Sequence, residues 1–269
     1  MRTVALLNKK GGVGKTSTCH HVAGAFSAKS LRVLLVDADP QASLTQGLLG
    51  PEATRALNPA RTIATLFDEA GGPAVADLIL PTPVPGVSIL PGSEAAEDLN
   101  VTRPAGTGLL QYALRDALAE VADQYDLALI DCPPNVQLCS WAALVAADGV
   151  VVPLQAEDYG SQGVVAIQAS IRRVQGATNP RLVTLGYLIT MYNKSLGVHV
   201  AYEADLRQIY GDLVFTNVVP LAKDFKEAVM ARKPVGLYKP RSAASKATIA
   251  LADELLARIA RIESQGEAA

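Results

Sequence analysis

Residues 2–17 read RTVALLNKKGGVGKTS, and the prediction of the whole fold starts from this stretch. Thr3–Leu7 is a short run of β-branched and aliphatic side chains, which is typical of a buried strand. The run ends at a glycine-rich turn, and the residues from Lys15 onward have the pattern of a helix. A strand, a glycine loop and a helix N-terminus in succession bring backbone N–H groups and the positive end of a helix dipole together. The stretch therefore predicts an anion-binding site.

The loop has the residue types that a nucleotide phosphate requires. Successive backbone N–H groups can converge on phosphate oxygens, and glycine lets the backbone take positive φ and approach a ligand closely. Lys15 is expected to reach the β- and γ-phosphates, and Thr16 to offer its hydroxyl to Mg²⁺. We therefore predict that this loop contacts a nucleotide through Gly11, Gly12, Val13, Gly14, Lys15, Thr16 and Ser17.

Two later strands are predicted to end in carboxylates. The apolar run at 31–37 ends in Asp37 and is followed by Asp39, and the run at 125–131 ends in Asp131. In an open α/β sheet, ligands bind beyond the carboxyl ends of the strands. Asp37 and Asp39 alternate across the strand end, so one is expected to face Mg²⁺ and the other the attacking water. Asp131 is expected to hold the metal directly or through water. The predicted metal ligands are Thr16, Asp37 and Asp131.

The composition favours one α/β domain. The chain has 269 residues, of which 49% are hydrophobic and only 5% aromatic, which suits an aliphatic parallel sheet covered by helices. The formal net charge is −2, so any binding to nucleic acid must come from a local patch. The three cysteines fit no metal spacing, and no apolar run approaches the roughly 18 residues of a membrane span. We expect a cytoplasmic protein with one domain at 1–264 and a short tail at 265–269.

The loop departs from the standard phosphate-binding pattern at one position. The pattern G-x-x-x-x-G-K-[ST] requires glycine where the chain has Lys9, and a second lysine, Lys10, precedes the glycines. This arrangement resembles the deviant Walker A motif of the MinD/ParA ATPases. The segments VDADPQ at 36–41 and DCPP at 131–134 are similar to further motifs of that family. The resemblance covers nearly the whole chain and is closest to the small chromosomal type. It implies a single-domain deviant P-loop fold, with a mostly parallel twisted sheet and helices on both faces.

The resemblance also implies a mechanism and partners. Two protomers would enclose two ATP–Mg²⁺ units, with Lys15 acting in its own site and Lys10 reaching the nucleotide of the partner. Asp39 matches the residue that positions or activates water, so the implied catalytic residues are Lys10, Lys15 and Asp39. ATP hydrolysis would be slow, would be stimulated by a ParB-like protein and would dissolve the homodimer. The dimer would bind double-stranded DNA non-specifically, in association with the nucleoid, and would segregate or position a chromosome or plasmid.

The residues around the base are predicted from the same relatives. In P-loop relatives the end of the strand expected at Leu182–Met191 borders the base, so Met191 and Asn193 are candidate contacts. Many ParA proteins read I-P-R-N after the next strand, whereas this chain reads VPLA at 219–222. Pro220 is therefore a third candidate contact, and the usual arginine and asparagine are replaced by Leu221 and Ala222.

Lysine and arginine gather in the stretch from Pro220 to Lys246. A local basic patch supplies what non-specific phosphate binding needs, although a solvated lysine-rich surface has the same composition. The resemblance favours DNA binding. The predicted DNA contacts are Lys194, Lys223, Lys226, Arg232, Lys233, Arg241 and Lys246.

Alternative functions within and near the family stay open at this point. The cargo could be a chemoreceptor cluster or a protein microcompartment, which the sequence does not distinguish from DNA. A MinD-like membrane regulator would need a basic amphipathic tail, and the chain ends in ESQGEAA, so no membrane partner is expected. An iron–sulfur ATPase would need paired cysteines, and a P-loop ligase would need a small-acid pocket that the sequence does not indicate.

Some local expectations concern individual elements. We expect a last strand at Val214–Val219, a helix at Gly108–Tyr125 that buries Leu109, and a closing helix at Ala243–Ile262 that packs Ile249 on the sheet. His20 and His21 are adjacent, so their side chains should leave a helix in different directions and should not chelate a metal together.

Overall fold

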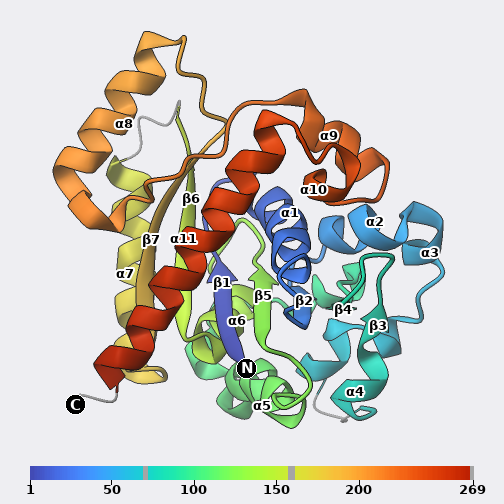
Figure 1. The fold of residues 1–269 in the computed structure, drawn as a ribbon. Helices are drawn as coiled ribbons and strands as arrows, with labels where there is room; N and C mark the ends of the chain where they lie inside the picture. Colours follow the sequence, from blue (N-terminus) through green and yellow to red (C-terminus); the bar gives the residue numbers. More distant parts are fainter. Residues whose placement is uncertain (69–71, 157–160, 267–269) are drawn as a thin grey trace.

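The structure, a computed structural model, describes residues 1–68, 72–156 and 161–266. A seven-stranded sheet forms its centre, in the order β3-β4-β2-β5-β1-β6-β7 (Figure 1). All neighbouring strands pair in parallel except β3 and β4, which are antiparallel. The strands are β1 Arg2–Leu6, β2 Val33–Asp37, β3 Leu80–Pro81, β4 Val87–Leu90, β5 Leu127–Asp131, β6 Gly149–Gln155 and β7 Val183–Thr190. The predicted α/β fold with a mostly parallel sheet is confirmed.

Helices cover both faces of the sheet, as predicted. Side chains of β1 alternate between two cores, with Val4 and Leu6 packed beside α1, α2 and α11, and Ala5 in the core that contains α5, α6 and α7. This alternation follows from the period of two in a strand. The α-helices are α1 Lys15–Ser27, α2 Ser43–Leu49, α3 Pro51–Arg55, α4 Val75–Leu78, α5 Ala113–Glu120, α6 Leu138–Ala146, α7 Ser161–Ala177, α8 Gly197–Tyr210, α9 Lys223–Met230, α10 Val235–Tyr238 and α11 Ala243–Gly266. Short 3₁₀ helices are η1 Pro59–Arg61, η2 Ile63–Phe67, η3 Glu94–Ala96, η4 Pro104–Gly106, η5 Gly108–Tyr112 and η6 Gly211–Leu213.

The prediction of a last strand at Val214–Val219 is wrong. This segment runs beside β7, but Val214 forms only an isolated bridge to Tyr187. Side chains of α11 take the backbone groups that a strand would need. Arg258 donates to the carbonyl oxygen of Val214 at 3.0 Å, and the carboxylate of Glu254 accepts from the N–H groups of residues 216 and 217 at 2.8 and 2.9 Å. The segment is therefore fixed by side chains instead of by a continuous ladder.

Two helix faces also differ from the prediction. The expected helix at 108–125 is the 3₁₀ helix η5 followed by α5, and Leu109 is 84% exposed. Because a 3₁₀ helix has three residues per turn, it turns Leu109 away from the apolar face that an α-helix would give it. In α11, Leu251 is buried and Ile249 is 43% exposed, since residues two apart on a helix do not share a face.

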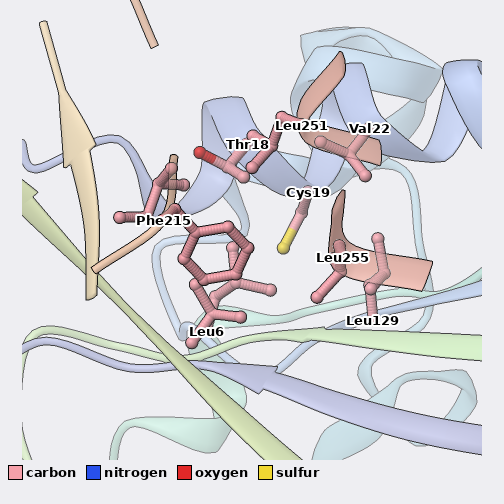
Figure 2. A pocket seen from close by; sticks show the side chains of 10 residues that line it. Leu6, Thr18, Cys19, Val22, Leu129, Phe215, Leu251 and Leu255 are labelled. Atoms are coloured by element: carbon pink, nitrogen blue, oxygen red, sulfur yellow. The ribbon is translucent and has the colours of Figure 1, made fainter. Parts of the chain in front are cut away.

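The contact between α1, the sheet and α11 encloses a small apolar cavity of about 10 Å³ (Figure 2). Cys19 and Val22 of α1, Leu255 of α11 and Phe215 point into it. The thiol of Cys19 is fully buried here, and this burial raises its pKa well above the usual value. Cys19 is therefore a neutral packing side chain.

Leu255→Ala should lower the free energy of unfolding by about 2–5 kcal/mol, because it removes buried methyl groups and enlarges this cavity. The measurement is urea denaturation, in which the midpoint should fall while the slope stays constant. Ile249→Ala on the exposed side of the same helix is the matched control and should stay within about 0.5 kcal/mol of the unsubstituted chain. Equal losses in both variants would contradict the packing of α11 described here.

Candidate functional site

The glycine loop lies between β1 and α1 and is anchored by Asn8. The Asn8 side chain is buried, its Nδ2 donates to the Pro153 carbonyl oxygen at 2.6 Å, and its Oδ1 accepts from the Lys10 N–H at 2.9 Å. Gly12 and Gly14 have φ of 76° and 87°, a backbone conformation that favours glycine. α1 begins directly after Gly14. The predicted strand, loop and helix N-terminus are therefore all present, with the free N–H groups of α1 at the loop.

The ammonium group of Lys15 lies at this loop. The side chain is only 6% exposed, and its Nζ donates to the carbonyl oxygens of Asn8 and Lys10, both at 3.2 Å. Both of these partners are uncharged carbonyl oxygens. The two hydrogen bonds therefore leave the positive charge of the buried ammonium group without a counter-anion. Lys10 itself is exposed. The two lysines therefore differ in burial, and the expected role of Lys10 in the site of a partner stays a prediction.

Asp37 and Asp131 end adjacent strands and lie directly beside each other in the sheet register. Both are fully buried. Oδ2 of Asp37 accepts from the Thr45 N–H at 2.8 Å and from the Thr45 hydroxyl at 2.7 Å. Oδ1 of Asp37 and both carboxylate oxygens of Asp131 have no hydrogen-bond partner within the described part of the chain. Three buried carboxylate oxygens thus remain available at one place.

This arrangement fits a hard divalent cation. Burial raises the pKa of Asp37 to about 7, and burial together with the neighbouring Asp37 charge raises the pKa of Asp131. The Thr16 hydroxyl lies beside Asp131 and lowers the pKa of Asp131. Oxygen ligands and a local excess of negative charge are what Mg²⁺ requires, with phosphate oxygens and water completing its shell. Among the residues described, no three His, Cys, Asp or Glu side chains form a metal cluster by themselves.

Asp39 is half-buried and lies two residues after Asp37, and its charge raises the pKa of both Asp37 and Asp131. Its Oδ1 accepts from the Gln41 N–H at 3.0 Å, and its carbonyl oxygen accepts from the Ala42 N–H at 2.8 Å. Ala42 adopts a left-handed φ of 50° and directly precedes α2. The side chain of Asp39 is therefore held by a local turn at the end of β2, near the Asp37–Asp131 pair.

The sequence analysis missed several residues that support the site. Thr45 holds Asp37, and its hydroxyl also accepts from the Gly92 N–H at 2.9 Å. A Cβ at Gly92 would lie 2.8 Å from Cγ of Asp37, so this position has room only for glycine. The Thr190 hydroxyl donates to the Val13 carbonyl oxygen at 2.9 Å and ties the loop to β7. A buried Asn or Thr carries no sequence signal of its role, because its partner is distant in the chain.

A mostly apolar pocket of about 360 Å³ lies beside the loop and is suited to a planar base. Gly14, Met191 and Pro220 line it, as do Leu221 and Ala222, the residues that depart from the family pattern. Apolar side chains therefore form the wall where relatives carry Arg and Asn. Asn193 does not line this pocket, and its Oδ1 accepts from the Ser195 N–H at 3.0 Å. The predicted base contact of Asn193 lacks support from this geometry.

The basic residues of the C-terminal part are mostly exposed. Lys226 and Lys223 lie on α9, and Lys223 also pairs with Glu227 at 3.4 Å while its side chain stays 83% exposed. The remaining predicted DNA contacts, Lys194, Arg232, Lys233, Arg241 and Lys246, are exposed as well. In contrast, Lys239 is neutralised by Asp224 at 2.8 Å and Glu227 at 2.6 Å. No helix within the described ranges is long and apolar enough to cross a membrane.

A parallel sheet with a glycine loop, a buried lysine and paired carboxylates at the strand ends defines a P-loop nucleoside triphosphatase. Comparison with known proteins places the chain more closely. A family model described as an AAA domain matches residues 1–184. The chain is 36% identical over 262 residues to the chromosome partitioning protein ParA of Caulobacter vibrioides, covering 96% of this chain and 95% of that protein. The chain therefore belongs to the ParA/MinD family of ATPases.

Further relatives agree with this assignment. The chromosome-partitioning ATPase Soj of Thermus thermophilus is 37% identical over 259 residues, covering 96% of this chain and 97% of that protein. The crystal structure of cobyrinic acid a,c-diamide synthase from Mycobacterium smegmatis, with a bound ATP analogue and magnesium, superposes with a TM-score of 0.77 and 30% identity. The superposition covers 95% of this chain and 94% of the synthase chain. The fold is thus shared with a structure that contains a bound ATP analogue and magnesium.

Proposed function

We propose that this chain is an ATP- and Mg²⁺-dependent ATPase that dimerises around ATP, binds DNA non-specifically and segregates or positions DNA with a ParB-like partner. The observation that carries the proposal is the buried group of Lys15, Asp37 and Asp131, which places one ammonium group and three carboxylate oxygens without a hydrogen-bond partner among the described residues at the phosphate loop. The partition proteins among its relatives support the role in positioning DNA. The protein would act in the cytoplasm, on the nucleoid.

Each residue of the site would have its own role in binding or hydrolysing ATP. Thr16, Asp37 and Asp131 would hold Mg²⁺, which supplies positive charge to the β- and γ-phosphates. The loop N–H groups and Lys15 would bind the same phosphates, and Met191 and Pro220 would contact the base. Asp39 would orient the attacking water. Lys10 would enter the site of the partner, so hydrolysis would depend on the dimer. Loss of the γ-phosphate would then dissociate the dimer.

Lys10→Ala should leave ATP binding nearly intact but remove both hydrolysis and the stable ATP dimer. The reason is that Lys10 is exposed and, in the proposed dimer, its charge would act on the γ-phosphate in the site of the partner. Equilibrium binding of a fluorescent ATP analogue, phosphate release and sedimentation velocity measure the three properties. Lys9→Ala, which removes the neighbouring exposed lysine, is the matched control and should behave like the unsubstituted chain. A Lys10→Ala protein that dimerises normally with ATP would contradict the assignment.

DNA binding should require ATP and should weaken steeply with salt, because exposed cations of two protomers would contact phosphates together. The experiment measures binding to random-sequence duplex DNA without nucleotide, with ADP and with ATP, over a salt series. Lys223→Ala combined with Lys233→Ala should reduce the magnitude of the slope of log affinity against log salt by roughly 2 for each protomer of the dimer. Lys29→Ala is the control, since Lys29 lies beyond the far end of α1 and pairs with Asp253.

The outcomes separate this function from its alternatives. Absence of DNA binding in every nucleotide state, with ATP-driven dimerisation retained, would overturn the DNA role. That result would favour a non-DNA cargo, such as a receptor cluster or microcompartment. Binding to anionic vesicles in place of DNA would instead favour a MinD-like membrane-associated regulator.

A further inference from the structure

The segment that carries Arg232 and Lys233 rests on the two helices that leave the nucleotide site. α1 starts at the phosphate loop and α2 starts just after Asp39, and α10 and α9 pack against them (Figure 1). The contact is close, because a Cβ at Gly24 of α1 would lie 2.2 Å from Cβ of Pro234. Glycine at this position therefore allows α10 to approach α1.

His20 and His21 form the polar part of this contact. Both side chains are 2% exposed. Nδ1 of His21 accepts from the Val235 N–H at 3.1 Å, and its ring lies 5.0 Å from the ring of Phe225 in α9. The ring of His20 meets that of His21 edge-on at 4.9 Å. His21 thus holds the Val235 N–H at the start of α10, and His20 packs against the ring of His21.

The protonation of the pair suits this role. Burial lowers the pKa of His20, and it lowers the pKa of His21 to about 3. The rings are therefore neutral near pH 7, and Nδ1 of His21 can accept a hydrogen bond. Nε2 of each ring has no partner among the described residues. An apolar side chain would avoid this unsatisfied nitrogen but could not hold the Val235 N–H.

We propose that His21, supported by His20, is a positioning residue of the DNA-binding face, which it fixes on the helix that begins at the phosphate loop. The proposal rests on the proposed DNA-binding function. Two exposed cations, Arg232 and Lys233, directly precede Pro234 and Val235, and Arg232 adopts a left-handed φ of 54° with its guanidinium placed over Gly50, which follows α2. A non-glycine residue keeps this backbone conformation only where its surroundings hold it. Backbone hydrogen bonds from the Arg232 N–H to the Val229 carbonyl oxygen at 2.9 Å and from the Lys233 N–H to the Ala228 carbonyl oxygen at 3.0 Å tie both cations to the end of α9. Because His21 packs on Phe225 of α9 and bonds the Val235 N–H, loss of the His21 contact would displace Arg232 and Lys233 together with the end of α9.

The test compares His21→Leu with His21→Asn in the full chain, with ATP, Mg²⁺ and random-sequence duplex DNA. Leucine cannot accept the Val235 N–H, whereas the Asn oxygen can take the place of Nδ1. We expect His21→Leu to reduce the magnitude of the slope of log affinity against log salt by roughly 1–2 for each protomer of the dimer, the value for one or two lost phosphate contacts. His21→Asn should restore the slope. Both variants should bind ATP like the unsubstituted chain.

Two further variants separate positioning from general loss of packing. Val22→Ala removes a neighbouring buried side chain of α1 that faces the sheet cavity instead of α10 (Figure 2), and it should leave the salt slope unchanged. Gly24→Ala should displace Pro234 while favouring the helix, so it should reduce the magnitude of the slope like His21→Leu. Gly24→Ala supplies the decisive measurement if His21→Leu does not fold.

The proposal is overturned by an unchanged slope in His21→Leu, or in Gly24→Ala where His21→Leu does not fold. An equal loss in Val22→Ala, or no rescue by His21→Asn, overturns it as well. Failure of the proposed function looks different, because the unsubstituted chain would then bind no DNA in any nucleotide state. That result removes the DNA-binding function and the positioning role with it.

Discussion

Lys15→Ala is expected to reduce ATP turnover by about 10²–10³-fold or more, the cost of removing one well-placed charge donor from a transition state. Lys15 is buried with its Nζ on the carbonyl oxygens of Asn8 and Lys10, so its cation already lies at the loop before nucleotide binds. ATP affinity should fall too, because the same charge neutralises the bound phosphates. Phosphate release and titration calorimetry with ATP and Mg²⁺ measure the two effects.

The control for Lys15→Ala is Lys15→Arg, which keeps the positive charge but replaces a compact ammonium by a planar fork. We expect Lys15→Arg to retain part of the ATP affinity and to remain slow in turnover. Thermal unfolding without nucleotide should show that both variants are folded. Normal turnover in Lys15→Ala would rule out the glycine loop as the catalytic site.

Asp39→Ala is expected to lower turnover by about 10²–10⁴-fold, the usual contribution of a residue that accepts a proton from or orients the attacking group. ATP binding should survive, because Asp39 is not among the proposed Mg²⁺ ligands and its Oδ1 accepts from the nearby Gln41 N–H. The protein should then accumulate as an ATP-bound dimer. Size-exclusion chromatography with ATP and Mg²⁺ detects the dimer, and its DNA binding should exceed that of the unsubstituted chain.

Asp39→Asn tests the reason for this effect. The Asn oxygen can keep the bond to Gln41, so the turn before α2 stays intact while the carboxylate is lost. If the carboxylate acts on the water, Asp39→Asn should trap the dimer as Asp39→Ala does. Turnover near the normal rate in Asp39→Asn would limit the residue to a structural turn, and a monomeric Asp39→Ala with ATP would contradict the water-positioning role altogether.

The sequence alone was enough where a feature is local. The phosphate loop is contiguous, so the order of strand, glycines and lysine predicts its shape from the backbone preferences of those residues alone. The strand ends at Asp37 and Asp131 could also be predicted, because short apolar runs that stop at a carboxylate are read directly from the chain. The α/β class follows from the same runs.

Some predictions failed in segments whose backbone N–H and C=O groups have more than one possible hydrogen-bond partner. The segment at 214–219 has the composition of a strand, but Arg258 and Glu254 of α11 take its polar groups. Leu109 follows a helical pattern, but a 3₁₀ turn rotates it into solvent. Composition describes the preference of a segment, and the neighbouring elements decide which competing contact forms.

The sequence by itself thus determined the sheet class, the phosphate loop and the acidic strand ends, because each depends on residues close together in the chain. Only the tertiary structure decided how Thr45 and Gly92 shape the site of Asp37, and that Leu221 rather than Asn193 lines the apolar pocket beside the phosphate loop. It also brought the Val235 N–H to His21, which is 214 positions earlier in the chain. Such contacts leave no local pattern, because their energy depends on distances that folding alone creates.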